Sequence, residues 1–571
     1  MALLSPSRVR HVLQLVSLPL IAVLVAACGG SAAPPSSAAA SSSPAASTAA
    51  SASPSTSSAA PTSSAAGGPS GTLTFSVPSF LVETFDPSIT QSLISSPSLG
   101  APIFQGLWAY MPPNGKIMPY LLDSATMAPD AMSWTLKLRK GITFSDGSPM
   151  TSADVKFSID RYRSPQARTS NTQTLQHLIK DVTIVDPLTV KIDLNSPSVQ
   201  FPGVMTFPGN SVLMLPKAYI DKVGWGTFAT KPMGSGPYIL ASHTPGQSVT
   251  YTPSSHYWGG PTGKSHASFS TIKVLKVPDE QTRIAQLQSH SADIAEISAT
   301  SVKQAQQANL HVLSFPDSIP YAIFFAGDYG NFPNSPLRNT DVRKALNLAI
   351  DRKALLNGLN AGQGEVANLF SKPDPSIGIP NVPPIPYDPA QAKQLLAKAG
   401  YPNGFTLKFW ATDIVACSAD YAKQMGESLA SYWGKIGVKT DVVPIAYTLL
   451  RPKVFANPVA PDVAGTAYDW CAGGPTPAAE QMETLFYTKG PIHETNVADA
   501  AITKALDATS ASTQVQLTSA AWMQLYNEYV DVPLYHGPYL FAADAKAANY
   551  PITPGLPDML SWWATSLPFS S

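Results

Sequence analysis

The chain has 571 residues, and its 37 lysine and arginine residues balance 37 aspartate and glutamate residues. Because the formal net charge is zero and no basic run occurs, the composition gives no electrostatic support for nucleic-acid binding. We therefore expect no nucleic-acid partner. A body of this length can form two or three domains with substantial cores.

The amino terminus has the features of a secretory signal. Two arginines precede a mostly apolar run from Val12 to Ala27, which is too short for a comfortable transmembrane helix. The small residues before Cys28 resemble a bacterial lipobox, in which the cysteine receives a diacylglycerol and the signal, residues 1–27, is removed. An ordinary signal peptide cleaved after Ala27 is the alternative. We expect lipidation of Cys28, because two or more acyl chains give stable anchoring.

The segment 28–70 is expected to be the lipidated cysteine followed by a disordered linker. Apart from the cysteine it consists almost entirely of Ser, Ala, Pro, Gly and Thr, a composition that cannot bury enough apolar surface to fold. No second apolar run reaches membrane-spanning length. We therefore expect the body, residues 71–571, to lie outside the membrane.

A strand, a turn and a capped helix are predicted next. Apolar and polar residues alternate over 134–138, which predicts a strand with one buried face. Asp146-Gly147 is a tight-turn dipeptide. Thr151 stands three residues before Asp154, the spacing at which the two side chains cap a helix start reciprocally. One face of that helix is marked by Val155, Ser158, Ile159 and Tyr162.

The later elements follow the same two periodicities. A helix is expected between the cap residue Asp388 and Gly400, with proline at its first position. Further strands are expected at 238–240, 272–277 and 439–443, and further helices at 279–287 and 341–352. Strands that alternate with helices in the second half indicate an α/β sheet.

The literal string from residue 134 to residue 162 resembles the signature of the solute-binding proteins of peptide-type ABC importers, which are extracytoplasmic receptors for peptides, nickel and related solutes. Other parts of the chain resemble segments of the same family, and together they cover the body from about residue 72 to about residue 540. These are residues 83–87, 103–107, 234–238, 341–352 and 388–401. The family commonly has glycine where His290 stands, which makes the backbone of that turn uncertain from sequence.

The resemblance implies an α/β fold of the periplasmic-binding-protein type, with two lobes joined by crossing segments and an extra domain inserted in the first lobe. We expect lobe I to comprise 71–112, 230–330 and 533–571. The inserted domain is expected at 113–229, and lobe II at 331–532.

The resemblance also indicates a ligand-binding segment, Tyr468-Asp469-Trp470-Cys471-Ala472-Gly473-Gly474. It aligns with the family's cleft segment, often W-x-A-D in peptide binders, whose aspartate pairs with the free amino terminus of the ligand. Gly473 occupies that position here, so the charge partner is missing, and Asp469 is a candidate substitute. A blocked peptide, a sugar or another solute therefore becomes a stronger candidate for the ligand.

Trp470 of this segment and four further residues complete the expected site. Trp470 is the leading ligand contact, with a purely structural aromatic as the alternative, because large aromatics supply contact area at small entropic cost. Tyr447 matches a cleft aromatic and could equally pack in the core. Tyr535 lies where the family chain returns to the first lobe beside the ligand. Thr90 and Gln91 could supply hydrogen bonds or be ordinary loop residues.

Two cysteines remain in the body, Cys417 and Cys471. In an oxidising compartment a disulfide between them is plausible, and two buried free thiols are the alternative. Cys471 next to Trp470 could be read as a nucleophile, but no Cys-His-Asn arrangement is visible.

Enzyme, cofactor and metal chemistry each lack their required residues. Ser235 lies between glycines without nucleophile-elbow spacing, and the nine histidines form no pair at metal-ligand spacing. No Walker lysine or dinucleotide fingerprint occurs. We therefore expect no catalytic residue, no cofactor and no directly bound metal.

These observations predict a lipid-anchored receptor on the outer face of a bacterial cell membrane. It is expected to act as a monomer that captures a peptide or other small solute between two lobes and delivers it to the permease and ATPase subunits of an ABC importer. The alternatives are a surface protein that senses or adheres without transport, and a binder of a sugar or metal chelate.

Overall fold

The computed structural model describes residues 69–551, apart from 81–82, 90–98, 112–115, 170, 207–211, 262, 264, 328–333, 415–416, 457, 473–477, 491 and 493–494. The signal at 1–27 and Cys28 lie outside the described residues. Within the described part, no helix combines the length and the apolar content needed to cross a bilayer.

A four-stranded antiparallel sheet lies in the first half of the chain, in the order β4-β5-β7-β6. Its strands are β4 (Leu122–Met127), β5 (Ser133–Leu138), β6 (Ile179–Asp186) and β7 (Thr189–Leu194). In β5 Trp134, Leu136 and Leu138 are buried, which confirms the predicted alternation. A separate hairpin joins β2 (Trp108–Met111) to β3 (Lys116–Pro119).

Helix α1 (Ser152–Tyr162) packs against β6 and β7. The backbone N–H of Thr151 and its hydroxyl both donate to the Asp154 carboxylate, at 2.8 and 2.9 Å. The other Asp154 oxygen accepts from the backbone N–H of Lys217 at 2.9 Å. The predicted cap at this helix start is therefore confirmed, and it also ties the helix to a later segment.

The larger sheet has eleven strands in the order β15-β14-β16-β12-β17-β11-β1-β10-β9-β8, with β13 paired to β17. Parallel pairs (β1 with β10, β14 with β15) occur beside antiparallel ones, which gives a mixed α/β architecture. The strands are β1 (Thr72–Val77), β8 (Tyr238–Thr244), β9 (Ser248–Pro253), β10 (Thr271–Lys276), β11 (Ile294–Glu296), β12 (His311–Phe325), β13 (Glu365–Val366), β14 (Thr406–Thr412), β15 (Lys439–Ile445), β16 (Ala467–Trp470) and β17 (Asp531–Ala543).

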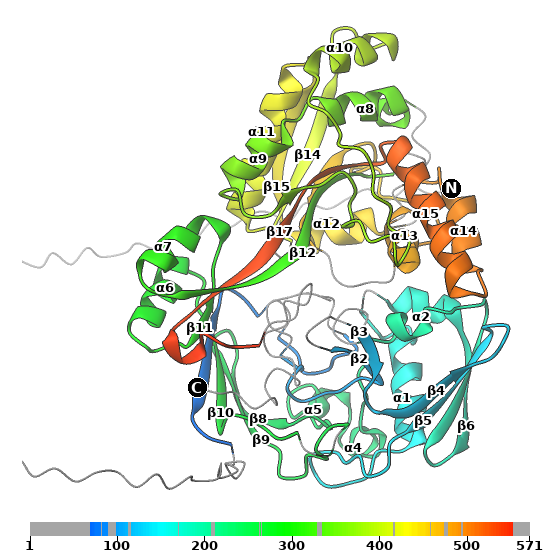
Figure 1. Ribbon diagram of the computed structural model, residues 1–571, viewed down its shortest axis with the longest axis vertical. Helices are drawn as coiled ribbons and strands as arrows, with labels where there is room; N and C mark the ends of the chain where they lie inside the picture. Colours follow the sequence, from blue (N-terminus) through cyan, green and yellow to red (C-terminus); the bar gives the residue numbers. More distant parts are fainter. Residues whose placement is uncertain are drawn as a thin grey trace, which may run out of the picture. The chain divides into compact units, whose positions relative to one another are not determined.

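Two long antiparallel strands, β12 and β17, join the two halves of this sheet and run side by side (Figure 1). At one end β17 pairs with β11, and at the other end β12 pairs with β16. Their register shifts between Phe315 and Ile319 and again between Tyr321 and Ala322. The pair β12 and β17 therefore connects the strands on one side of the sheet, β14 to β16, with those on the other side, β1 and β8 to β11.

The helix expected over 341–352 is confirmed as far as Leu348 by α8 (Thr340–Leu348) and is wrong beyond it, because the chain breaks before a second helix, α9 (Arg352–Leu359). The chain turns because the Asp351 carboxylate accepts from the backbone N–H of Ala354 at 2.9 Å and so caps a new helix. The helix between Asp388 and Gly400 is confirmed as α10 (Pro389–Lys398).

The remaining helices cover the sheets or connect strands. His290, in the turn after α6, has a φ of 55°, the left-handed conformation that glycine adopts readily. These helices are α2 (Thr172–Leu178), α3 (Phe201–Val204), α4 (Lys217–Val223), α5 (Trp225–Phe228), α6 (Glu280–Gln288), α7 (Val302–Gln307), α11 (Ala419–Gly434), α12 (Tyr447–Val454), α13 (Ala478–Phe486), α14 (Asp499–Leu506) and α15 (Ala511–Asn527), with short 3-10 turns at Ala299–Ser301, Pro336–Arg338 and Ala545–Ala547.

Candidate functional site

Strand β16 and the residue directly after it, Cys471, contain four of the predicted site residues and divide them between two faces. Successive side chains of a strand point to opposite faces. Tyr468 and Trp470 lie on one face, where their rings are 6.5 Å apart in an edge-on contact. Asp469 and Cys471 share the other face, with Oδ2 of Asp469 4.0 Å from the Cys471 sulfur. The segment therefore presents two aromatic rings on one face and a carboxyl and a sulfur on the opposite face.

Trp470 is the centre of the aromatic face. Its ring lies 5.5 Å from the ring of Phe324 on β12 and 6.2 Å from that of Tyr447. Its indole N–H donates to the carbonyl of Ala472 at 2.6 Å, so its polar atom is satisfied within the same segment. Because 9% of Trp470 is exposed, most of the ring packs within the protein and only an edge is open to solvent.

Tyr447 is the first residue of α12 and is partly buried. Its backbone N–H donates to the carboxylate of Asp413 at 2.7 Å, which fixes the start of the helix. Burial raises the pKa of the Tyr447 hydroxyl to about 12, so this group stays a neutral donor and acceptor in the physiological range. Tyr447 and Trp470 together offer aromatic surface of the kind that ligand sites use.

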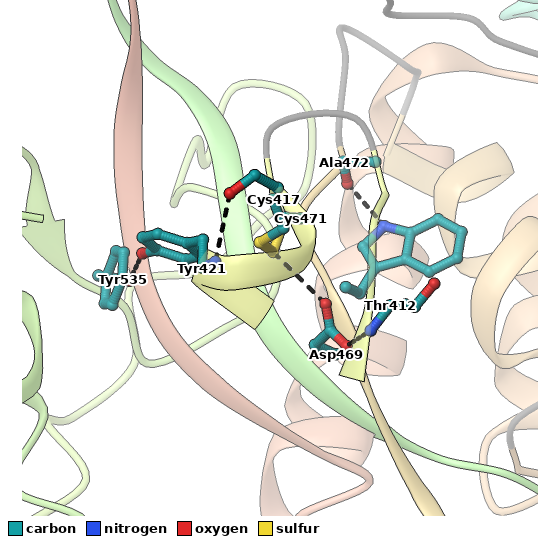
Figure 2. Close-up of a disulfide and its surroundings, with 9 residues drawn as sticks. Thr412, Cys417, Tyr421, Asp469, Cys471, Ala472 and Tyr535 are labelled. Atoms are coloured by element: carbon teal, nitrogen blue, oxygen red, sulfur yellow. Dashed lines mark hydrogen bonds between the residues drawn. A yellow bond between two sulfur atoms is a disulfide. The ribbon is translucent and has the colours of Figure 1, made fainter. Parts of the chain in front are cut away.

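The structure joins Cys417 and Cys471 by a disulfide, with their Cα atoms 5.7 Å apart. Asp469 lies beside this bridge and is fully buried. Its carboxyl accepts a hydrogen bond from the backbone N–H of Thr412 at 2.7 Å, as Figure 2 shows. Burial raises the pKa of Asp469 to about 8. The Asp469 carboxyl is thus held by contacts within the protein, and its role as a partner for a ligand amine stays a prediction.

Tyr535 on β17 belongs to a second aromatic group on the other side of the disulfide. It is fully buried, and its ring lies 4.6 Å from the ring of Tyr321. Its hydroxyl meets the hydroxyl of Tyr421 on α11, and Figure 2 shows the two pointing toward each other. This contact links β17, the long strand, to a helix of the second half.

Three of the predicted site residues, Thr90, Gln91 and Gly473, lie outside the described residues. Two residues of the aromatic groups, Tyr321 and Tyr421, were missed from the sequence. The apolar run around Tyr321 is a signal for a buried strand, but no local pattern places Tyr421 against a strand more than a hundred residues away.

The cluster has few means for chemistry on a ligand. Among the described residues, the one group of side chains with metal-binding potential is Cys417, Asp469 and Cys471. The disulfide occupies both sulfurs, and metal binding requires thiolates. Because the sulfurs are bonded and the carboxyl is buried, the arrangement provides packing surface and no nucleophile.

A second acidic group was also missed, the buried Glu480 and the half-buried Glu483 on α13. Glu480 is 5% exposed, and it lies among buried apolar residues of the helix. The sequence could have revealed Glu480 as an acidic residue among apolar ones on a helix. Its neighbours Ala479 and Met482 are fully buried. Both acidic residues line a cavity whose other wall belongs to the first half of the chain.

The described fold is thus a mixed α/β sheet with two long connecting strands beside an aromatic cluster. The chain belongs to the bacterial extracellular solute-binding proteins, family 5, whose middle-region model matches residues 116–490. This confirms the family that the segment 134–162 indicates. Proteins of this family bind solutes for transport, which agrees with the expected absence of catalysis.

Three known proteins illustrate the similarity. The chain is 26% identical to heme-binding protein A of Haemophilus influenzae over 79% of this chain and 85% of the relative. It is 31% identical to the glutathione-binding protein GsiB of Salmonella paratyphi A over 63% of this chain and 67% of the relative. The ABC transporter-associated periplasmic binding protein DppA of Helicobacter pylori, solved with the peptide STSA, has the same fold, with a TM-score of 0.70 and 20% identity over 86% of this chain and 98% of DppA.

Proposed function

We propose that this protein is the receptor of an ABC importer, which captures a peptide or peptide-like solute between two lobes and delivers it to a membrane permease. The observation that carries the proposal is the strand pair β12 and β17, which joins both halves of the large sheet beside the aromatic cluster of Trp470. The names of the similar proteins, which bind heme, glutathione or a peptide, support a small solute as the cargo.

The proposed layout has lobe I at 71–112, 230–330 and 533–571, the inserted domain at 113–229, and lobe II at 331–532. In this layout β12 and β17 reach from lobe I to the boundary of lobe II. A solute that contacts both lobes stabilises the closed form, because only that form uses both surfaces. The closed form then presents the face that a permease recognises.

The proposal includes membrane anchoring through a lipid on Cys28, with residues 29–70 as a tether. Metabolic labelling with a radioactive fatty acid tests this part. We expect label in the wild-type protein and none in the Cys28→Ala variant. Continued incorporation into Cys28→Ala would contradict the anchor without affecting the binding proposal.

The binding proposal is tested by native mass spectrometry of the freshly purified protein, followed by calorimetry with pooled peptides, sugars and metal chelates. We expect saturable binding of a peptide pool. Tight binding of a sugar or a chelate alone would overturn the peptide part, and Gly473 gives a reason to include those pools. No binding to any pool would contradict solute capture itself.

Trp470→Phe tests whether the aromatic cluster contacts the solute, because phenylalanine keeps much of the packing and loses the larger ring. We expect the dissociation constant to rise about tenfold. Tyr387→Phe is the matched control, since Tyr387 is 44% exposed and lies outside the cluster. Equal affinities of wild type and Trp470→Phe would remove Trp470 from the site.

Transport is tested separately from binding. In cells that depend on the solute, deletion of the gene should abolish uptake, and the wild-type gene should restore it. Normal uptake by the deletion strain would favour the alternative, a surface protein that binds a solute for sensing or adhesion.

A further inference from the structure

A small cavity lies between α13 and the segment from α2 to residue 198. Thr174, Ser196 and Ser198 line one wall, and Glu480 and Glu483 line the other. The cavity volume is about 70 Å³. A single water needs about 10–15 Å³ of such space, so the cavity has room for several waters or one small chemical group. It is too small for a whole peptide.

Glu480 is the unusual residue of this cavity. It is 5% exposed, and its Oε2 atom is buried without a hydrogen-bond partner among the described residues. Neither Glu480 nor Glu483 forms an ion pair with a described lysine, arginine or histidine. An unpartnered buried polar atom costs free energy unless something occupies the space beside it.

A positive charge in this cavity would stabilise the ionised forms of both acidic residues. Burial raises the pKa of Glu480 to about 8, and the neighbouring charge of Glu483 raises it further in the same direction. Burial also raises the pKa of Glu483, to about 7. A bound cation would let both groups ionise, since an opposite charge nearby favours the charged form. The opposite wall offers hydroxyl groups, which can accept hydrogen bonds.

We infer that this cavity binds the cationic head group of a small solute, an ammonium or a guanidinium, through Glu480 with support from Glu483. The inference rests on the proposed function and narrows its substrate class. An organic cation fits better than a metal ion, because Glu480 and Glu483 belong to no described group of side chains close enough together to hold one. N–H donors of an ammonium or guanidinium can reach acceptors on both walls.

The position of the cavity also links binding of the head group to closure of the proposed lobes. One wall belongs to the proposed inserted domain, and the other belongs to the proposed lobe II. A cation held by α13 and by the hydroxyl wall therefore contacts two parts of the chain at once. Its binding would favour the arrangement in which these parts meet.

The inference is tested on the full chain with methylguanidinium chloride and methylammonium chloride as probes, and N-methylurea as the neutral control. Saturation-transfer NMR titrations at constant ionic strength give the dissociation constants. We expect both cations to bind more tightly than N-methylurea. In Glu480→Gln the dissociation constants of the cations should rise about tenfold or more, because a charge-assisted hydrogen bond is lost.

Glu483→Gln should weaken binding by a smaller factor. Glu427→Gln is the matched control, because the Glu427 side chain is 59% exposed and lies on another helix, and it should bind the cations like the wild type. The inference is overturned if the wild type binds the cations no better than N-methylurea, or if Glu480→Gln binds them unchanged.

A second measurement on the wild type does not depend on any variant. Because the free carboxyl of Glu480 holds its proton near neutral pH, cation binding should release protons, and the dissociation constants should fall as pH rises through about 7 and 8. The titratable groups beside Glu480 are Glu483, Tyr110 and, across the cavity, His177. Calorimetry in buffers of different ionisation enthalpy measures the release, and binding without it would contradict the inference.

The outcomes separate the head-group site from solute capture. If peptide or other pools bind while the cationic probes do not, the proposed function stands and this inference fails. If no pool binds at all, solute capture itself fails, whatever the probes do.

Discussion

Asp469 and Glu480 are two buried carboxyl groups with similarly raised pKa values, each about 8 and each caused mainly by burial. They differ in their partners. Asp469 accepts a hydrogen bond from the backbone of Thr412 at 2.7 Å and packs beside a disulfide. Glu480 has an oxygen with no partner among the described residues and faces a cavity. Burial alone therefore does not separate the two groups; Glu480 differs from Asp469 in the space and in the unused hydrogen-bonding capacity beside it.

The largest effect is expected in the packed surroundings of Asp469. Trp470→Ala removes a ring that contacts Phe324 and Tyr447, and we expect it to lower the free energy of unfolding by about 3–5 kcal/mol. Urea denaturation followed by circular dichroism measures the change. A loss below about 1 kcal/mol would show that the cluster is loosely packed and would weaken the contrast with the cavity.

Removal of the disulfide should have the next largest effect. The bridge closes a loop with a sequence separation of 54, and the double variant Cys417→Ser with Cys471→Ser should lose about 2–4 kcal/mol. Reducing agent should lower the unfolding midpoint of the wild type and leave that of the double variant unchanged. A wild type that is insensitive to complete reduction would contradict a stabilising bridge.

Glu480→Gln should change stability in a way that depends on pH. The pKa of Glu480 in the folded protein, about 8, lies above its ordinary value of 4.5, so the folded state holds this proton more tightly than the unfolded chain. Its contribution to stability is complete below about pH 4.5 and is lost as pH rises through about 8. Glutamine cannot ionise, so we expect the variant to match the wild type near pH 4, to exceed it by about 2 kcal/mol near pH 6, and to exceed it by more at higher pH.

Thermal unfolding of both proteins across this pH range measures the difference, without added solute. Glu427→Gln, on an exposed helix face, should show no such pH-dependent divergence from the wild type. If the stabilities of wild type and Glu480→Gln changed in parallel with pH, Glu480 would ionise like the exposed Glu427, and its raised pKa would be contradicted.

The smallest effect is expected for Asp469→Asn. Near neutral pH the carboxyl is already mostly protonated, and the asparagine oxygen can still accept from the Thr412 backbone. We expect a change within about 1 kcal/mol near pH 7 and no change in the binding of methylguanidinium. Weakened binding of methylguanidinium by Asp469→Asn would place Asp469 in the head-group site and would contradict the distinction between Asp469 and Glu480.

The sequence determined the features that depend on neighbouring residues. The alternation in β5, the reciprocal cap at Thr151 and Asp154, and the bounded helix α10 all follow from contacts within a few positions. The family could be identified for the same reason, because its signature is a continuous string.

Only the tertiary structure decided what lies beside each segment. Arg352, at the start of α9, donates to the Pro533 carbonyl, 181 positions away, at 2.6 Å. The meeting of Tyr421 with Tyr535 and the cavity at Glu480 arise in the same way. Caps and periodicities are local, whereas pairing, burial and unpartnered atoms depend on distant segments that packing brings together.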